Sequence, residues 1–381
     1  MMKVLSIIDS VSLYGKERAN LQVAHVLKKN GYDVKILINR LADQSIREEV
    51  IPFDTLELPF PRNIKGKFRF IKFVIAYFRT MIKFGFLLKK ESPEYLLIPT
   101  EIAIAYLYFP LICFKTKVVF RCGDSPIIMR KNGFIAKIYG WLWRFFFVRR
   151  VDKLVCNAKF IYRQIIDSGR KKNNNDCIIY NYPPIRTNSN DNIVYPNCSS
   201  CLRVGFLGRV VPEKGVYELI QSVITANKED IKVVAYIGGD VNIDKQYSEK
   251  LYKLIKENNI GKECLFFIGN VKDLKKFYEN IDLMVIPSIY EEPMANVVTE
   301  AKQYCKPSVI FNLGGMTEII EHKKTGYICK EISPASLKEA YLYYYNHKEE
   351  IKRQGNNAYK SIKDLGLDLN NFEKHWLNVF N

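Results

Sequence analysis

The chain has 381 residues, of which 48 % are apolar and 26 % are charged. These values are ordinary for a folded protein and exclude a disordered or fibrous chain. Because single hydrophobic cores rarely keep growing beyond ~250 residues, the length predicts about two domains.

The net charge of +18 is unevenly distributed along the sequence. Residues Met1 to Tyr182 carry 32 Lys and Arg against 15 Asp and Glu, whereas the remainder carries 26 against 25. A basic excess confined to one half indicates a polyanionic partner, either nucleic acid or an anionic membrane.

Nine scattered cysteines favour a reducing cytoplasm, because the number is odd and a chain of this length needs no disulfide staples. Cys198 and Cys201 form a single Cys-x-x-Cys. A structural zinc site would need two further ligands at matched spacing, so we expect two free thiols in a linker. No signal peptide or transmembrane segment is predicted, since the apolar runs are short or interrupted by charge.

The N-terminal half alternates short apolar runs with longer helical patterns. A helix is predicted over Lys16–Lys29, and Gly31 behind it suits a C-cap, so the first elements form a βαβ unit. Strands buried on both faces are expected at Lys3–Ile8, Asp33–Ile38, Tyr95–Pro99, Lys117–Phe120, Lys153–Cys156 and Cys177–Ile179.

A linker rich in Pro, Asn and Ser is expected at 183–200, after which the alternation restarts. Strands are predicted at Leu202–Leu207, Val233–Ile237, Leu265–Ile268, Leu283–Ile286, Ser308–Phe311 and Tyr327–Cys329. Helices are predicted at Val216–Thr225, Tyr247–Glu257, Leu274–Tyr278, Ala295–Gln303 and Thr317–Glu321.

The pattern predicts an α/β protein of two doubly wound, Rossmann-like domains that face each other across a cleft. The first domain covers 1–182 and the second 201–355. A helical tail over 356–381 is expected to pack back on the first domain. Ligands of such sheets bind outside the carboxyl ends of the strands.

Two cations follow the first strand of the second domain. Gly208 permits a tight turn behind that strand, and Arg209 and Lys214 lie in the loop before the next helix. Cations at this place can hold a diphosphate, each charge-assisted contact contributing ~1.5–3 kcal/mol. The alternative is a solvated loop with ordinary surface charges.

Two carboxylates follow the strand at Leu283–Ile286. Glu292 is expected in the loop and Glu300 in the helix behind it. Carboxylates are strong acceptors for sugar and ribose hydroxyls, and the helix N-terminus offers free N–H groups to an anion. The alternative assigns Glu292 to capping and leaves Glu300 solvated.

Glycines at two further strand-to-helix turns are weaker signals. Gly314 and Gly315 follow the strand at Ser308–Phe311, and Gly15 lies in the first turn of the chain. Glycine allows the backbone close to a ligand, but a tight turn alone explains it equally well.

In combination, these segments resemble glycosyltransferase family 4, a group of retaining enzymes with the GT-B fold. The resemblance runs from Lys3 to about Tyr327 and is carried by four segments in family order. These are Gly-Arg…Glu-Lys-Gly from Gly208, Phe-Ile-Gly-Asn-Val at 267–271, Pro-Ser…Glu-Pro…Glu-Ala from Pro287, and Gly-Gly…Glu-Ile-Ile…Thr-Gly-Tyr from Gly314.

The resemblance implies roles for these residues. Arg209 and Lys214 would bind the donor pyrophosphate, Glu300 the ribose and Glu292 the donor sugar, and with Arg209 and Lys214 we count Glu292 as catalytic. The remaining donor-binding positions would be Gly15, Gly208, Val271, Met294, Ala295 and Asn296.

The sequence departs from the family pattern in three places. Tyr14 precedes Gly15 where many members have a second glycine, and Met294-Ala295 replace a Phe-Gly pair. Gly123 occupies the position of a family histidine. Arg121 or Asp124 are therefore candidates for contacting the acceptor.

No Asp-x-Asp motif occurs in the chain, so we expect neither a metal nor another cofactor. The sequence thus predicts a metal-independent, hexosyltransferase-type glycosyltransferase that uses a UDP- or GDP-sugar and an acceptor that is a glycan or lipid-linked saccharide. The resemblance implies retention at the transferred sugar, and we expect a role in bacterial surface polysaccharide or lipopolysaccharide assembly. The alternatives are a non-catalytic nucleotide-sugar-binding regulator and a sugar-nucleotide epimerase of the same fold.

The basic half carries two stretches in which aromatic and basic residues are interleaved, Pro61–Lys90 and Ile138–Arg150. This chemistry suits an anionic bilayer and, less well here, single-stranded nucleic acid. The alternative is two amphipathic helices with solvated outer faces. We predict a cytoplasmic protein bound peripherally to the inner face of the cell membrane.

Overall fold

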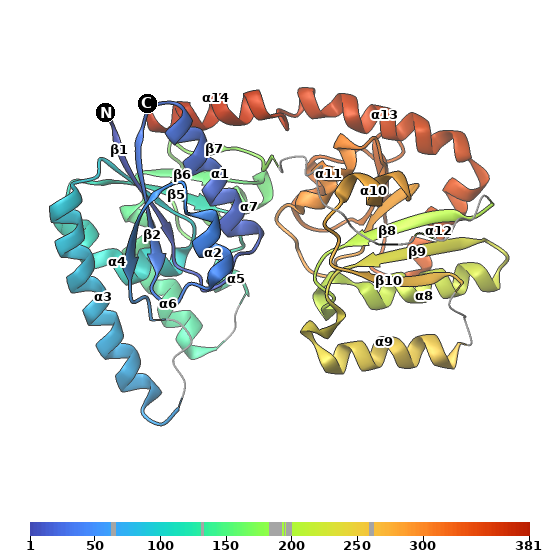
Figure 1. The fold of residues 1–381 in the computed structure, drawn as a ribbon, viewed down its shortest axis with the longest axis horizontal. Helices are drawn as coiled ribbons and strands as arrows, with labels where there is room; N and C mark the ends of the chain where they lie inside the picture. Colours follow the sequence, from blue (N-terminus) through green and yellow to red (C-terminus); the bar gives the residue numbers. More distant parts are fainter. Residues whose placement is uncertain (62–65, 131–132, 183–192, 194, 196–199, 259–262) are drawn as a thin grey trace. The chain divides into compact units, whose positions relative to one another are not determined.

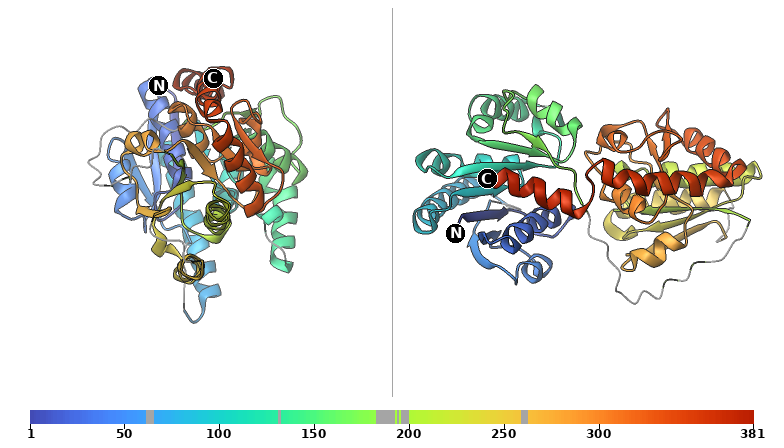
Figure 2. Two further views of the ribbon diagram at one scale, coloured as in Figure 1. Left: turned by 90° about the vertical axis from the view of Figure 1, so that its right-hand side faces the viewer. Right: turned by 90° about the horizontal axis from the view of Figure 1, so that it is seen from above.

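The computed structural model describes residues 1–61, 66–130, 133–182, 193, 195, 200–258 and 263–381. They form two compact units. The first comprises Met1–Asn181 with Leu369–Asn381, and the second comprises Tyr182–Asp368. Each unit is built on one parallel sheet with helices packed on it (Figures 1 and 2).

The first unit contains a seven-stranded parallel sheet in the order β3-β2-β1-β4-β5-β6-β7. Its strands are β1 (Lys3–Ile8), β2 (Asp33–Asn39), β3 (Asp54–Leu58), β4 (Tyr95–Ile98), β5 (Lys117–Cys122), β6 (Lys153–Cys156) and β7 (Cys177–Ile178). Its helices are α1 (Gly15–Lys29), α2 (Gln44–Glu49), α3 (Arg69–Glu91), α4 (Glu101–Cys113), α5 (Ile127–Arg130), α6 (Phe134–Phe145), α7 (Lys159–Asp167), α14 (Leu369–Phe380) and the 3₁₀ helix η1 (Phe147–Arg150).

The second unit contains a six-stranded parallel sheet in the order β10-β9-β8-β11-β12-β13. Its strands are β8 (Leu202–Leu207), β9 (Val233–Gly238), β10 (Leu265–Gly269), β11 (Leu283–Ile286), β12 (Ser308–Phe311) and β13 (Gly326–Cys329). Its helices are α8 (Val216–Lys228), α9 (Lys245–Glu257), α10 (Leu274–Glu279), α11 (Asn296–Gln303), α12 (Pro334–Asn346), α13 (Lys348–Asp364) and the 3₁₀ helices η2 (Pro212–Lys214), η3 (Val241–Ile243) and η4 (Gly314–Glu318).

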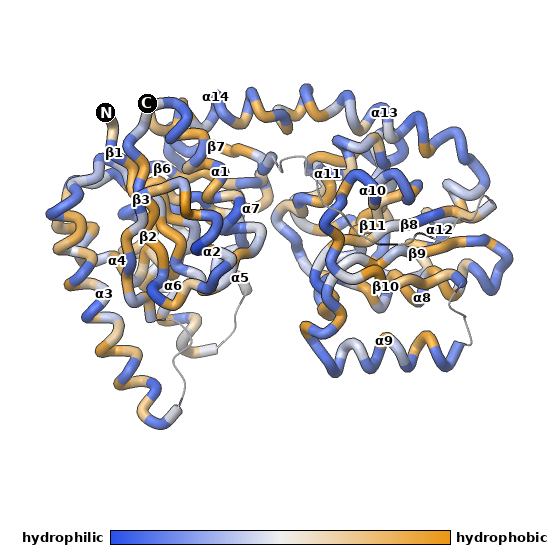
Figure 3. The backbone as a smooth tube through the Cα atoms, in the orientation of Figure 1, coloured by the Kyte–Doolittle hydropathy of each residue, from blue (hydrophilic) through white to orange (hydrophobic). Residues whose placement is uncertain are grey.

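The predicted fold class is confirmed, because both sheets are parallel and doubly wound. The central strands are apolar on both faces: β4, β9, β11 and β12 are buried along their whole length. In Figure 3 the hydrophobic colours gather in the sheets of both units, as at the labelled strands β2 and β9. Burial on both faces explains why uninterrupted apolar runs marked these strands in the sequence.

Two elements differ from the sequence-based expectation. The strand β3 was not predicted, because it lies at the sheet edge and most of its residues are exposed. An edge strand needs no continuous apolar run. The helix expected at Thr317–Glu321 is instead the 3₁₀ helix η4, which starts at Gly314.

The C-terminal segment is divided between the two units. Helix α13 packs on α11 in the second unit, whereas α14 packs on α1 in the first. Trp376 and Phe380 of α14 are buried. The Phe380 ring packs edge-on against the Tyr95 ring, with the ring centroids 5.2 Å apart. The chain thus passes from one unit to the other after Asp368, later than the tail predicted over 356–381.

The predicted linker at 183–200 lies outside the described residues apart from 193, 195 and 200. Cys198 therefore has no structural description. Cys201 forms a disulfide, so the expectation of a free thiol is wrong for that residue. Whether two cysteines can form a disulfide depends on how the folded chain places them in space, and their separation in the sequence does not reveal this.

A buried ion pair stabilises the end of the first sheet. The Arg170 guanidinium donates two hydrogen bonds to Asp176, at 2.7 and 2.6 Å, and both side chains are almost fully buried. Asp176 also accepts a hydrogen bond from the Leu154 N–H. Removing one partner of such a pair leaves an uncompensated buried charge.

We expect Arg170→Ala to lower the free energy of unfolding by about 3–5 kcal/mol. The control is Lys275→Ala, which removes an exposed pair with Glu279 and should cost less than about 1 kcal/mol. Denaturant titration of both variants measures the difference. Equal losses in the two variants would show that burial does not set the strength of the Arg170 pair.

Candidate functional site

The second sheet reverses its winding between β8 and β11, which are neighbours in the sheet but lie far apart in sequence. Strands β9 and β10 extend to one side of this point, and β12 and β13 to the other. Doubly wound sheets bind ligands at the carboxyl ends of the strands beside such a reversal, where the loops behind β8 and β11 begin. Both loops carry predicted site residues.

Lys214 and Glu292 form the centre of this site. The Lys214 ammonium lies 2.5 Å from a carboxylate oxygen of Glu292, and both side chains are largely buried. The other Glu292 oxygen accepts a hydrogen bond from the buried Ser288 hydroxyl at 2.6 Å. The Lys214 ammonium also lies 3.4 Å from the Tyr290 hydroxyl. The structure thus joins one cation of the first loop to one carboxylate of the second.

Glycines bring these two loops into contact. Gly215 has φ +70°, and a Cβ at this position would overlap the carbonyl oxygen of Pro287. Gly314 has φ +66°, and a Cβ there would overlap the backbone of Glu292, which accepts a hydrogen bond from the Gly315 N–H at 2.9 Å. The glycine pair at 314–315 therefore positions the carboxylate-bearing loop.

The other two predicted side chains have different partners. Arg209 is half exposed, and its guanidinium lies 3.7 Å from Glu213. Glu300, on α11, accepts a hydrogen bond at 3.4 Å from the hydroxyl of the buried Tyr278. Burial raises the pKa of Tyr278 well above its usual value, and the nearby Glu300 carboxylate raises it further, so this hydroxyl remains a donor.

The other predicted donor-binding residues of the second unit lie on the same edge of its sheet. Gly208 follows β8, and its N–H donates to the Gly238 carbonyl at 3.0 Å. A Cβ at Gly238 would lie 2.9 Å from the Val271 side chain, so these positions are close together. Met294 and Ala295 are buried, and Asn296 is the first residue of α11.

Sequence reasoning missed Ser288, Tyr290 and the pair Gly238-Gly239. Gly239 has φ +145°, and a Cβ there would overlap the Gly208 carbonyl oxygen. A glycine pair at the end of β9 resembles the pair behind β12 and could have been noticed. The roles of Ser288 and Tyr290 depend on side-chain contacts that no sequence pattern marks.

A second polar cluster lies at the carboxyl ends of the first sheet, whose winding reverses between β1 and β4. The Asp9 carboxylate, behind β1, accepts a hydrogen bond at 3.1 Å from Thr100, behind β4. Lys16 and Asp124 form an ion pair at 2.7 Å. Gly15, the first residue of α1, precedes this lysine.

Arg121, on β5, is another buried charged residue of that cluster. Its Nη2 donates to the Asn181 side chain at 2.7 Å, and its Nη1 has no hydrogen-bond partner among the described residues. Burial lowers the pKa of Arg121 to about 10. A Cβ at Gly123 would lie 3.5 Å from Asn157 and 3.9 Å from Arg121, so this position has room for a small side chain.

No group of three or more His, Cys, Asp or Glu side chains that could hold a metal ion occurs within the described ranges. Over those same ranges, none of the helices is both long and apolar enough to cross a membrane. Neither observation identifies the chemistry of the site, which rests on the residues present.

Two doubly wound parallel sheets of this kind also occur in solved structures of glycosyltransferases. The crystal structure of Anabaena HepE in complex with UDP and glucose has this fold, with a TM-score of 0.78, 17 % identity, and coverage of 100 % of this chain and 99 % of that one. Residues 202–361 match the family model described as glycosyl transferases group 1.

Curated relatives agree with this family match. The capsular polysaccharide biosynthesis glycosyltransferase CapM of Staphylococcus aureus is 25 % identical over 161 residues, 42 % of this chain and 41 % of CapM. An uncharacterized glycosyltransferase of Methanocaldococcus jannaschii is 28 % identical over 217 residues, 57 % of this chain and 56 % of the relative. The chain thus spans about half the length of the curated relatives it matches.

Proposed function

We propose that this chain is a glycosyltransferase that moves a sugar from a nucleotide-sugar donor to a saccharide or lipid-linked saccharide. The observation that carries the proposal is the Lys214–Glu292 pair at the winding reversal of the second sheet, inside the segment that matches the glycosyltransferase family model. The UDP and glucose bound by Anabaena HepE and the capsular role of CapM support a UDP-sugar donor and a surface polysaccharide product.

In the proposed reaction, Lys214 and Arg209 neutralise the negative charge that develops on the leaving nucleoside diphosphate. Such preorganised charge is usually the largest contribution to catalysis of this kind. Glu292 binds hydroxyls of the donor sugar, and Ser288 fixes the carboxylate from behind. Glu300 binds the ribose. With two basic side chains at the diphosphate, the proposed reaction needs no metal there, and the resemblance to glycosyltransferase family 4 implies retention at the transferred sugar.

The acceptor side of the reaction belongs to the first unit in this proposal. Asp124 is held by Lys16, and Arg121 keeps an unused donor beside Gly123. Both side chains follow or end β5, at the carboxyl edge of the first sheet. They would contact hydroxyl or anionic groups of the acceptor, in place of the histidine absent at position 123.

A thermal-shift panel of nucleotide-sugars tests the proposed donor. A ligand that binds only the folded state raises the melting temperature by mass action, so UDP-sugars should raise it and the matching free sugars should not. Release of free nucleotide from the stabilising donor then separates an enzyme from a regulator. Stabilisation without nucleotide release, over a range of saccharide acceptors, would favour the regulator.

We further propose that the first unit docks on an anionic lipid bilayer. Five apolar side chains of α3 recur at helical spacing and are all exposed: Ile71, Ile75, Phe78, Ile82 and Phe86. The opposite side of α3 is packed inward through Thr80, Phe84 and Leu88. An exposed apolar stripe of this length marks an interaction surface.

The charge around the stripe supports an anionic bilayer as the occupant. Lys72, Arg79 and Lys83 each directly follow a residue of the stripe. Helix α3 contains no acidic residue before Glu91. Helix α6 repeats the arrangement with exposed Phe134, Ile138, Trp141 and Phe145. Apolar side chains enter the acyl boundary while lysine and arginine meet anionic headgroups.

Co-sedimentation with vesicles tests this surface. We expect binding to phosphatidylglycerol-containing vesicles and little binding to pure phosphatidylcholine, and we expect Phe78→Ser/Ile82→Ser/Phe86→Ser to weaken it at least about tenfold. The control Ile243→Ser/Ile332→Ser removes exposed apolar residues of the second unit. Unchanged binding of the triple variant, or a wild-type dimer that covers α3, would refute the bilayer as occupant.

A further inference from the structure

A cavity of the second unit lies at the opposite edge of the sheet from the candidate site. Its volume is about 540 Å³, which is within the range of small-molecule sites. Leu202 and Arg203 open strand β8, while Asp282 and Lys306 lie just ahead of β11 and β12. These are the amino ends of the strands, whereas the Lys214–Glu292 pair follows their carboxyl ends.

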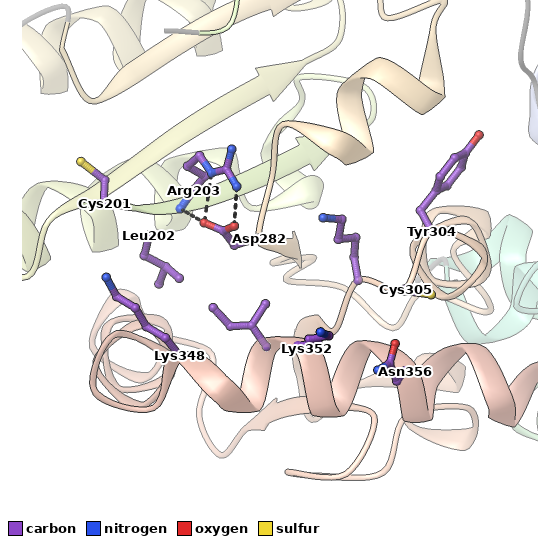
Figure 4. A pocket seen from close by; sticks show the side chains of 11 residues that line it. Cys201, Leu202, Arg203, Asp282, Tyr304, Cys305, Lys348, Lys352 and Asn356 are labelled. Carbon is purple, nitrogen blue, oxygen red and sulfur yellow. Dashed lines mark hydrogen bonds and ion pairs between the residues drawn. The ribbon is translucent and has the colours of Figure 1, made fainter. Parts of the chain in front are cut away.

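Helix α13 forms the opposite wall of this cavity. Lys348, Lys352 and Asn356 lie along one edge of α13, facing Arg203 and Asp282 (Figure 4). Leu202 and Ile351 supply apolar surface between the charged groups. The cavity therefore combines a basic rim with an apolar floor.

The charge of the cavity is strongly one-sided. Asp282 is its sole carboxylate among the described lining residues, and Arg203 already engages it through two guanidinium contacts, at 2.7 and 3.2 Å. The Arg203 N–H donates to the same carboxylate at 2.8 Å. Asp282 is thus engaged mainly by Arg203, and its charge also acts on Lys306. Lys348 and Lys352 form no ion pair with a carboxylate of the described cavity lining.

The lysine closest to the sheet gains most from a bound anion. Lys306 is partly buried, and its ammonium donates to the Ile281 carbonyl at 2.8 Å. Burial lowers the pKa of Lys306, because its charge is poorly solvated there. The Lys348 ammonium lies 5.7 Å from the Tyr345 ring, a contact that leaves its N–H groups available to an anion.

We propose that this cavity is a second ligand site that binds a small phosphorylated molecule, separately from the nucleotide-sugar site. Three lysines around one cavity suit a group with two or more negative charges, because each ammonium contributes a point charge with three donors. The volume exceeds that of a phosphate ion, and the apolar floor accommodates the sugar or nucleoside that carries the phosphate.

The cavity is connected to the candidate site through packed side chains. Tyr304, which lines the cavity, stacks on Tyr278 with ring centroids 4.7 Å apart and planes 10° apart. The Tyr278 hydroxyl in turn donates to Glu300. A ligand in the cavity therefore contacts a wall that packs on a residue of the proposed donor site.

Calorimetric titration tests the site in a full-length background that carries Arg209→Ala/Lys214→Ala, so that the proposed donor site no longer binds phosphate groups. Pyrophosphate, glucose 6-phosphate and inorganic phosphate are the probes, and glucose is the neutral reference. We expect pyrophosphate or glucose 6-phosphate to bind, and Lys348→Gln/Lys352→Gln to weaken that binding at least about tenfold. The stronger of the two probes distinguishes a diphosphate from a phosphate monoester.

The matched control is Lys360→Gln/Lys363→Gln, which removes two exposed lysines from the same helix outside the cavity. It should bind as the background does. Equal weakening by both lysine pairs would mean that net charge, not the cavity, holds the anion. Absence of binding to all three phosphates in the background would overturn the site outright.

The rate of chemical modification of Cys305 reports ligand binding in the cavity without a measurement of enzymatic activity. It is a free, exposed cysteine that lines the cavity. We expect pyrophosphate to slow its modification by a thiol reagent, measured on the Cys305 peptide by mass spectrometry, while the exposed Cys113 of the first unit reacts at an unchanged rate. Modification of both cysteines at unchanged rates under saturating probe would contradict the proposed location. Since neither measurement uses sugar transfer, failure here leaves the proposed function untouched.

Discussion

Replacing Lys214 with alanine is expected to lower kcat/KM for sugar transfer about a hundredfold, because ~2–3 kcal/mol of diphosphate stabilisation is lost in the transition state. The structure adds a second reason. The variant also leaves the largely buried Glu292 carboxylate with Ser288 but without its ammonium partner. Steady-state kinetics with the nucleotide-sugar that stabilises the protein measures the loss.

Lys253→Ala is the control for this variant, because Lys253 lies exposed on α9 in a long contact with Glu257. It should retain wild-type kinetics. Melting curves of both variants separate a catalytic loss from a folding defect. A correctly folded Lys214→Ala protein with wild-type kcat/KM would remove Lys214 from the proposed mechanism.

The second large effect is expected for Gly215→Ala. A Cβ at this position would overlap the Pro287 carbonyl oxygen, so the loops behind β8 and β11 must separate. The left-handed backbone adds ~1–2 kcal/mol of strain for any residue with a Cβ. We expect a loss of about 2–4 kcal/mol in stability and a fall in transfer rate at least as large as that of Lys214→Ala, because Lys214 directly precedes the glycine.

Gly269→Ala separates the two causes. Gly269 has nearly the same backbone conformation, with φ +68°, but a Cβ there meets no atom within 4 Å. The melting temperature of Gly269→Ala should therefore fall less than that of Gly215→Ala, because only backbone strain and no steric overlap is added. If both alanine variants melt at the same temperature, the contact with Pro287 does not hold the loops together.

Much of the fold was predictable from the sequence because parallel strands are buried on both faces and read as unbroken apolar runs. Lys3–Ile8 and Lys153–Cys156 were predicted with their observed bounds. The edge strand Asp54–Leu58 was missed, since most of its residues are exposed and no periodic signal marked it. Buried strands were therefore easier to predict from the sequence than the exposed edge strand.

The candidate site was predictable in its parts and not in its pairing. Residues that follow a strand are known to gather at the carboxyl edge of a sheet, so the placement of Lys214 and Glu292 could be expected. The sequence could not show which cation forms an ion pair with which carboxylate. Arg209 lies against Glu213 in its own loop, whereas Lys214 reaches Glu292, 78 positions away.

The same distinction applies to the basic half. Its aromatic and basic composition was visible in the sequence, but the exposed stripe from Ile71 to Phe86 was not. Periodicity alone does not tell which apolar residues of a helix face the core. Packing of Phe84 and Leu88 against the first unit decided this question, and it left the stripe outside.

The sequence by itself determined two parallel α/β sheets and the loops that carry the charged residues, because burial periodicity and turn chemistry act over a few neighbouring positions. Tertiary structure alone decided that Lys214 contacts Glu292 and that Lys306, Lys348 and Lys352 line one cavity. The physical reason is that strand order, which sets β8 beside β11, depends on the packing of the whole sheet and not on any local segment.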